Sequence, residues 1–155
     1  MGCLTSGRDS IDLSRFVEAQ QHTYPQALTE LRSGRKHSHW MWFIFPQLAG
    51  LGTSGISQRY AITSLAEAKA YLDHDVLGPR LIECTAAVNS IQDRSALEIF
   101  GYPDDMKFRS SLTLFELAAD SATEFAAALE KYFGGERDER THQLLRLAGA
   151  EGHQP

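Results

Sequence analysis

Residues 37–52 read HSHWMWFIFPQLAGLG and include the longest apolar run of the chain, residues 40–45. An apolar side chain at almost every position predicts a segment that is surrounded by protein, because a helix at the surface keeps one polar face. Pro46 ends regular structure or forces a bend. The run therefore predicts a central core helix whose aromatic rings are buried.

Helical patterns on both sides of this stretch predict an all-α fold. Before it, Pro25 suits the first turn of a helix that would end at Gly34. After it, three capping boxes of the form S-x-x-E predict helix starts at Ser64, Ser95 and Ser121. No run alternates in polarity for long enough to predict a strand, and no internal repeat is found. We expect a compact single-domain bundle of about seven to nine helices, several of them short.

The length and composition fit one folded domain. A chain of 155 residues with 43% hydrophobic and 23% charged residues is typical of a globular protein. We expect a disordered N-terminal tail over residues 1–11, a helical domain over residues 12–148 and a C-terminal tail over residues 149–155.

Charge and cysteine content limit the classes of partner and location. The net charge of -5 argues against wholesale nucleic-acid binding, which needs a basic face. No membrane association is expected, because the longest apolar run is too short to cross a bilayer and no secretory signal is present. The two cysteines do not suggest a disulfide framework. The expected location is the cytoplasm.

Polar residues beside the apolar run are the first candidate site residues. His39 and Gln47 adjoin aromatic residues, where a buried polar group without a partner costs about 1–3 kcal/mol. Partners within the protein are the commoner outcome, and a ligand is the alternative. Trp40 or Trp42 would offer a stacking face to such a ligand, and Lys36 a positive charge.

The glycine-rich loop that follows is the second candidate. Gly50 and Gly52 allow the backbone to approach a ligand, and the N–H groups from Gly50 to Ser54 could bind an anion, with Tyr60 as a further contact. The order of residues is not that of a P-loop. A plain turn explains the loop equally well.

The third candidate is a polar stripe at the edge of an apolar helix face. Asp104, Lys107 and Ser111 follow one another at helical spacing. A helix cap with a weak ion pair explains the aspartate but not why the lysine and serine border the apolar face. A lysine–serine catalytic dyad is conceivable, although no nucleophile motif accompanies it. No set of metal ligands at the right spacing is present, so neither a metal nor a cofactor is predicted.

Several stretches together resemble one known family. They are residues 12–13, 15–17, 19–20, 34–52, 60–62, 77–78, 80–81, 99–101 and 107–115. These stretches are similar to the uncharacterised, mainly α-helical bacterial family numbered eighteen-ten among the domains of unknown function. The resemblance implies a compact helical fold and no established activity. Some members carry the label calpastatin, but such inhibitors are disordered and repetitive, unlike this chain.

Three functional hypotheses follow. The first is a pocket for an anionic ligand, nucleotide-like or phosphorylated. If the pocket is catalytic, His39 would be the general acid or base, because histidine is the side chain suited to proton transfer near neutral pH, and Lys107 would assist. The second is a protein-interaction module that uses exposed Trp40 and Trp42. The third is that these residues only hold the fold together.

Overall fold

The described part of the chain folds into helices joined by short connections. The computed structural model describes residues 11–120 and 124–152, and in these residues it contains ten helices, seven of them with seven residues or more. In chain order they are α1 (Ser14–Gln20), α2 (Tyr24–Arg32), α3 (Met41–Ile44), α4 (Gly55–Arg59), α5 (Leu65–Asp73), α6 (Leu77–Asn89), α7 (Ala96–Phe100), α8 (Asp104–Ala118), α9 (Glu124–Phe133) and α10 (Glu139–Gly152). The all-α prediction is confirmed.

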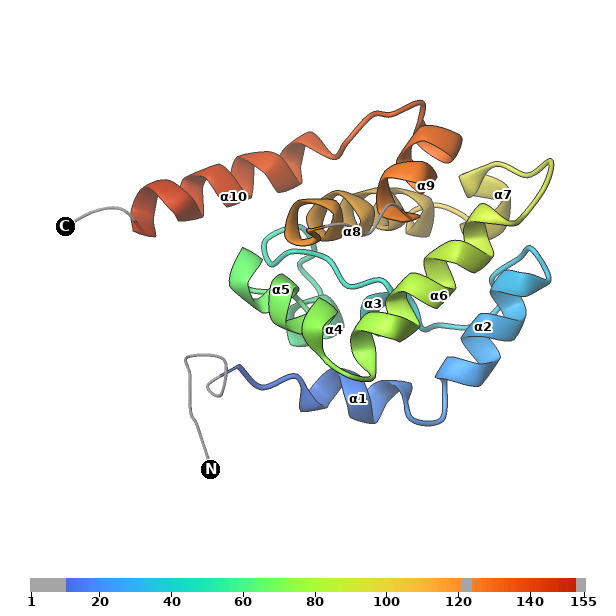
Figure 1. Cartoon of the computed structure of the whole chain (residues 1–155), viewed down its shortest axis with the longest axis horizontal. Helices are drawn as coiled ribbons and strands as arrows, with labels where there is room; N and C mark the ends of the chain where they lie inside the picture. The colour runs from blue at the N-terminus through green and yellow to red at the C-terminus, as the bar shows by residue number, and fades with distance from the viewer. Residues whose placement is uncertain (1–10, 121–123, 153–155) are drawn as a thin grey trace.

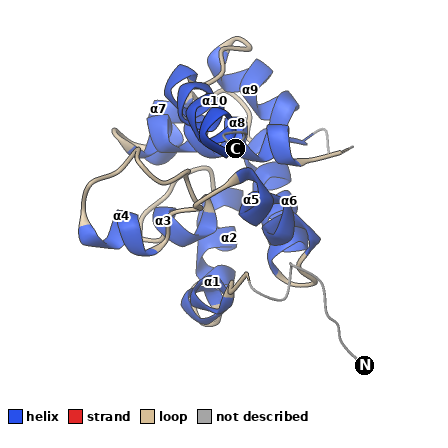
Figure 2. Cartoon of the chain, turned by 90° about the vertical axis from the view of Figure 1, so that its left-hand side faces the viewer, coloured by secondary structure: helices blue, strands red, loops and turns tan. Residues whose placement is uncertain are grey.

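Four of the longer helices form the centre of the molecule. α5 packs against α6 and α8, and α9 packs against the same two helices, so the four close into a ring (Figure 1). α2 lies on α6, α7 on α8, and α1 on α3. α10 contacts α8 and extends to one side of the other helices (Figure 1). α4 lies at the left edge of the molecule in the view of Figure 2.

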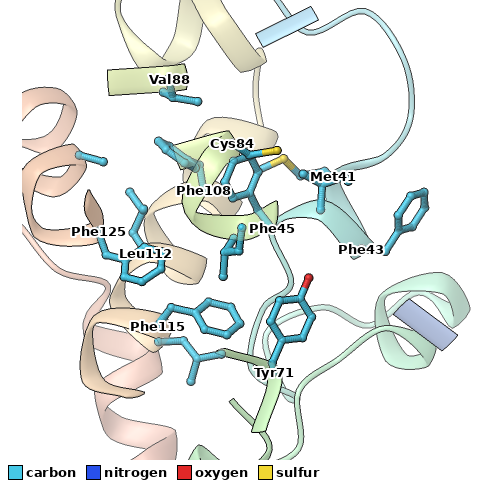
Figure 3. Close-up of a cluster of buried hydrophobic side chains, with 14 of the residues drawn as sticks. Met41, Phe43, Phe45, Tyr71, Cys84, Val88, Phe108, Leu112, Phe115 and Phe125 are labelled. Atoms are coloured by element: carbon cyan, nitrogen blue, oxygen red, sulfur yellow. The ribbon is translucent and has the colours of Figure 1, made fainter. Parts of the chain in front are cut away.

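The aromatic segment enters the core as predicted. Phe43, Ile44 and Phe45 are buried, and the Phe45 ring meets the Phe108 ring of α8 edge-on with centroids 4.9 Å apart. Figure 3 shows Phe45 among side chains of α6 and α8. The helix in this segment, α3, has only four residues, because Pro46 disfavours helical geometry at the residue before it.

Most predicted helix ends are confirmed. Ser95 makes both halves of its capping box with Glu98, and Gly34 ends α2 with a φ of +90°. Ser64 caps α5 by accepting the N–H of Glu67, but the Glu67 carboxylate accepts from Thr63 and so does not complete the box. The box predicted at Ser121 lies outside the described residues.

No β-strand is present in the described ranges, as expected, but two extended segments touch. Leu48 and Ile62 form an isolated parallel bridge, in which the N–H of Ile62 donates to the carbonyl oxygen of Gln47 at 2.8 Å. The carbonyl oxygen of Ile62 accepts from the N–H of Ala49 at the same distance. The bridge holds the stretch after the aromatic run against the stretch before α5.

Residues near both ends of the described chain have defined places. Ile11 packs against the core, and α10 continues to Gly152. The rest of the predicted N-terminal tail, residues 1–10, lies outside the described residues. None of the helices in the described residues is both long and apolar enough to span a membrane.

Candidate functional site

A single carboxylate of α2 holds the chain that leads into the aromatic segment. Glu30 is only 7% exposed and accepts five hydrogen bonds. The donors are the side-chain amide of Gln26, the backbone N–H groups of His37 and Ser38, the Ser38 hydroxyl and the Trp40 indole N–H. These bonds fix residues 37–40 and thereby place Trp40 and everything that follows it.

The same bonds favour the ionised form of the Glu30 carboxyl. Desolvation raises the pKa of its carboxyl, but the hydrogen bonds from Ser38, His37 and Trp40 outweigh this and lower the pKa from 4.5 to about 2. A group whose pKa is lowered by folding stabilises the protein above its unfolded pKa and loses that contribution as the pH falls.

We therefore expect an acid-sensitive contribution from Glu30. A shift of this size corresponds to about 3 kcal/mol, present above pH 4.5 and lost by about pH 2. Urea unfolding at several pH values should show wild type losing this amount relative to Glu30→Gln, which has no titrating group there. Parallel pH profiles of the two proteins would contradict the prediction.

Two lysines from distant parts of the sequence meet at Asp104, the first residue of α8. Lys36 Nζ lies 2.8 Å from Asp104 Oδ2, and Lys107 Nζ lies 3.7 Å from Oδ1. Each ammonium also lies over a ring face, at 5.2 Å from the Trp40 centroid for Lys36 and 5.2 Å from the Trp42 centroid for Lys107. The polar stripe of α8 is thus joined to the aromatic segment, and the ion-paired group carries one net positive charge.

A cavity of about 100 Å³ opens next to Trp42. Five predicted site residues line it: Trp42, Gln47, Gly50, Gly52 and Tyr60. The remaining lining comes from residues 48–49 and from Ser57, Gln58, Ala61 and Thr63. The cavity therefore lies at the Leu48–Ile62 bridge, where the two extended segments run side by side.

The walls of the cavity are built in two different ways. The Tyr60 ring packs against Phe43 and Phe16, with centroids 5.3 and 5.9 Å away, so that wall is anchored in the core. The glycine loop and α4, which has no buried residue, form another part of the lining. A Cβ on Gly52 would lie 2.6 Å from the Cβ of Ser57, so only glycine lets the loop close on α4.

Three predicted ligand contacts do not line the cavity. They are Ser54, Ser111 and Trp40. Ser54 does not line the cavity; it caps α4 by accepting the Ser57 N–H and donates its hydroxyl proton to Ser57 Oγ. Ser111 is buried, and its hydroxyl has no partner in the described part of the chain, Lys107 included. Trp40 has no exposed surface and its N–H is bound to Glu30, so it cannot stack on a ligand, which corrects the expectation.

Two further observations concern His39 and the possibility of a metal site. His39 is exposed and does not line the cavity, because the backbone bonds to Glu30 turn this short segment along the surface. Across residues 11–120 and 124–152, no three His, Cys, Asp or Glu side chains are grouped so that they could hold a metal ion.

Sequence reasoning missed Glu30, Ser57, Gln58 and Thr63. Glu30 lies one helical turn after buried Ala27, which is a weak signal of a buried carboxylate. No local signal marks Thr63, because the bridge that brings it to the cavity is long-range.

The comparisons with known proteins agree with the helical fold. The crystal structure of the conserved hypothetical protein Rv1873 from Mycobacterium tuberculosis is similar, with a TM-score of 0.87 and 58% sequence identity. The alignment covers 89% of this chain and 99% of that one. No protein with a curated description matches the sequence. The family model described as "Protein of unknown function (DUF1810)" matches residues 10–145. This match spans most of the chain, so the protein belongs to that family, as the resemblance implied.

Proposed function

We propose that this protein binds a small anionic molecule, nucleotide-like or phosphorylated, at the cavity beside Trp42. The observation that supports this most directly is that the cavity and a cation share one aromatic side chain. Trp42 lines the cavity, and Lys107 Nζ lies 5.2 Å from its ring centroid. A ligand resting on the indole can therefore reach the ammonium group with a negatively charged substituent.

The charge balance favours Lys107 over Lys36 as the group that binds the anion. Lys36 is 8% exposed and close to Asp104 at 2.8 Å, so its charge is neutralised within the protein. Lys107 is 22% exposed and 3.7 Å from the same carboxylate, beyond hydrogen-bond length. Lys107 thus keeps donors available for a ligand.

The proposal concerns binding and not catalysis. His39 is exposed and away from the cavity lining, and no hydrogen bond joins Lys107 to Ser111 among the described residues. The interaction module based on Trp40 and Trp42 is less well supported, because Trp40 is fully buried. The buried free thiol of Cys84 supports the cytoplasm as the location.

A thermal-shift panel of nucleotides, nucleotide sugars and phosphorylated metabolites tests this proposal. A compound present at a hundred times its Kd should stabilise wild type by about 2.7 kcal/mol, which raises Tm visibly. Lys107→Gln should weaken binding of the same compound about ten- to hundred-fold, since it removes one charge-assisted hydrogen bond.

Lys69→Gln is the matched control, because Lys69 is an exposed lysine of α5 that does not line the cavity. It should bind like wild type. Equal losses in both variants would point to a general effect of charge, and the absence of any stabilising compound would remove the proposal.

A further inference from the structure

The lining of the cavity contains no charged side chain. All the side chains around it are apolar, hydroxyl, amide or indole groups. Placing an ionised phosphate or carboxylate inside would remove it from water with no counter-charge in contact, which is unfavourable. The anion of the proposed ligand therefore belongs outside, toward Lys107, and an uncharged group belongs inside.

The size of the cavity limits that group to part of a ligand. Its volume of about 100 Å³ is below that of pockets that enclose whole ligands, about 300–1,000 Å³. It is also about a third smaller than an apolar protein cavity of about 150 Å³ that binds benzene. A planar group smaller than a benzene ring therefore fits inside, with the rest of the molecule outside.

Half of the polar side chains of the lining already have partners. The Ser57 hydroxyl accepts from Ser54, the Gln58 amide nitrogen donates to the carbonyl oxygen of Thr53, and the Thr63 hydroxyl donates to Glu67. The exceptions are the Trp42 indole N–H, the Gln47 amide and the Tyr60 hydroxyl, which form no hydrogen bond with any described residue. Polar groups without partners in a partly enclosed cavity are where a ligand gains hydrogen bonds.

We infer that the cavity recognises an uncharged, planar edge with an adjacent donor and acceptor, such as a carboxamide or a nucleobase edge. The side-chain amide of Gln47 carries both a donor and an acceptor in one plane, so it pairs with such an edge through two hydrogen bonds. Trp42 supplies the apolar surface for the ring, and the Tyr60 hydroxyl a third polar contact. This inference rests on the proposed function and adds the class of ligand.

Benzamide and benzoate are suitable probes because they have the same shape and differ in charge and donor capacity. The readout is the ¹H–¹⁵N signal of the indole groups, since the chain has only two tryptophans. Trp42 lines the cavity, whereas Trp40 is buried and bonded to Glu30 and serves as an internal reference. Benzamide should shift the Trp42 signal and leave that of Trp40 in place, and benzoate should bind at least about tenfold more weakly.

Gln47→Leu should reduce benzamide binding about tenfold or more, because it removes both hydrogen bonds and keeps the volume. Gln92→Leu is the control, since Gln92 is an exposed glutamine that does not line the cavity, and it should bind benzamide like wild type. Unchanged binding in Gln47→Leu, or benzoate binding as tightly as benzamide, would overturn the inference.

These outcomes are distinct from failure of the proposed function. A phosphorylated compound that shifts Trp42 while benzamide does not would overturn the inference and leave the anion-binding proposal in place. If neither probe nor any compound of the thermal-shift panel moved the Trp42 signal, both would fail.

Discussion

Replacing Glu30 by alanine should lower the free energy of unfolding by about 3–5 kcal/mol. The substitution removes a buried acceptor of five hydrogen bonds and leaves their donors without it. Each buried donor without a partner costs about 1–3 kcal/mol, and the costs are not additive because the segment can relax. The Trp40 indole N–H contributes most, because Trp40 is completely buried. Urea unfolding followed by circular dichroism gives the loss directly.

Two further variants show whether the effect comes from these bonds. Glu30→Gln keeps the size but replaces one acceptor oxygen by a donor, so it should lose roughly half as much as alanine, since some of the bonds survive. Glu18→Ala removes an exposed glutamate from α1 and should change stability by less than about 0.5 kcal/mol. A loss as small as this in Glu30→Ala would show that the segment is held by packing alone.

The helix ends that the sequence predicted are those set by short-range chemistry. Ser95 and Glu98 lie within one turn, and no other described residue bonds to either side chain, so the capping box forms as predicted. Glu67 has the same spacing from Ser64, but Arg15 of α1 reaches its carboxylate at 3.1 Å and the Thr63 N–H takes the other oxygen. The contact between Arg15 and Glu67 depends on how α1 packs against α5, which no local sequence pattern shows.

The candidate site also contains residues that local sequence could predict and residues whose position depends on long-range contacts. Four lining residues lie close together in sequence, so a site predicted at one of them includes its neighbours. They are Trp42, Gln47, Gly50 and Gly52. The exposed position of His39 depends on Glu30, which binds the two backbone N–H groups before it. A continuous run of apolar residues also does not predict which of its two tryptophans, Trp40 or Trp42, is buried in the core.

The Lys36–Asp104 ion pair also joins residues far apart in the sequence, and it gives Lys36 a structural role. The two side chains are 8% and 19% exposed and belong to the start of the aromatic segment and to α8. Asp104→Ala should therefore lower the free energy of unfolding by about 3–4 kcal/mol, because the Lys36 ammonium stays buried without its counter-charge. Thermal and urea unfolding measure the loss.

Asp105→Ala is a matched control at the next position of α8. It removes the same charge from the same helix end, but Asp105 pairs with no lysine, and its buried Oδ1 has no partner in the described residues. We expect this variant to be neutral or slightly stabilising. A loss equal to that of Asp104→Ala would assign the effect to the helix dipole instead of the ion pair.

The double variant Lys36→Met with Asp104→Ala separates the pair from the proposed ligand site. Replacing both members of a buried pair by apolar groups is often neutral, so most of the lost stability should return. Lys107 would remain beside Trp42 with no carboxylate near it, and anionic compounds should bind at least as tightly as to wild type. Loss of binding in this stable variant would mean that Lys36 or Asp104 contacts the ligand. Retained binding, together with its loss in Lys107→Gln, would assign the first lysine to the fold and the second to the ligand.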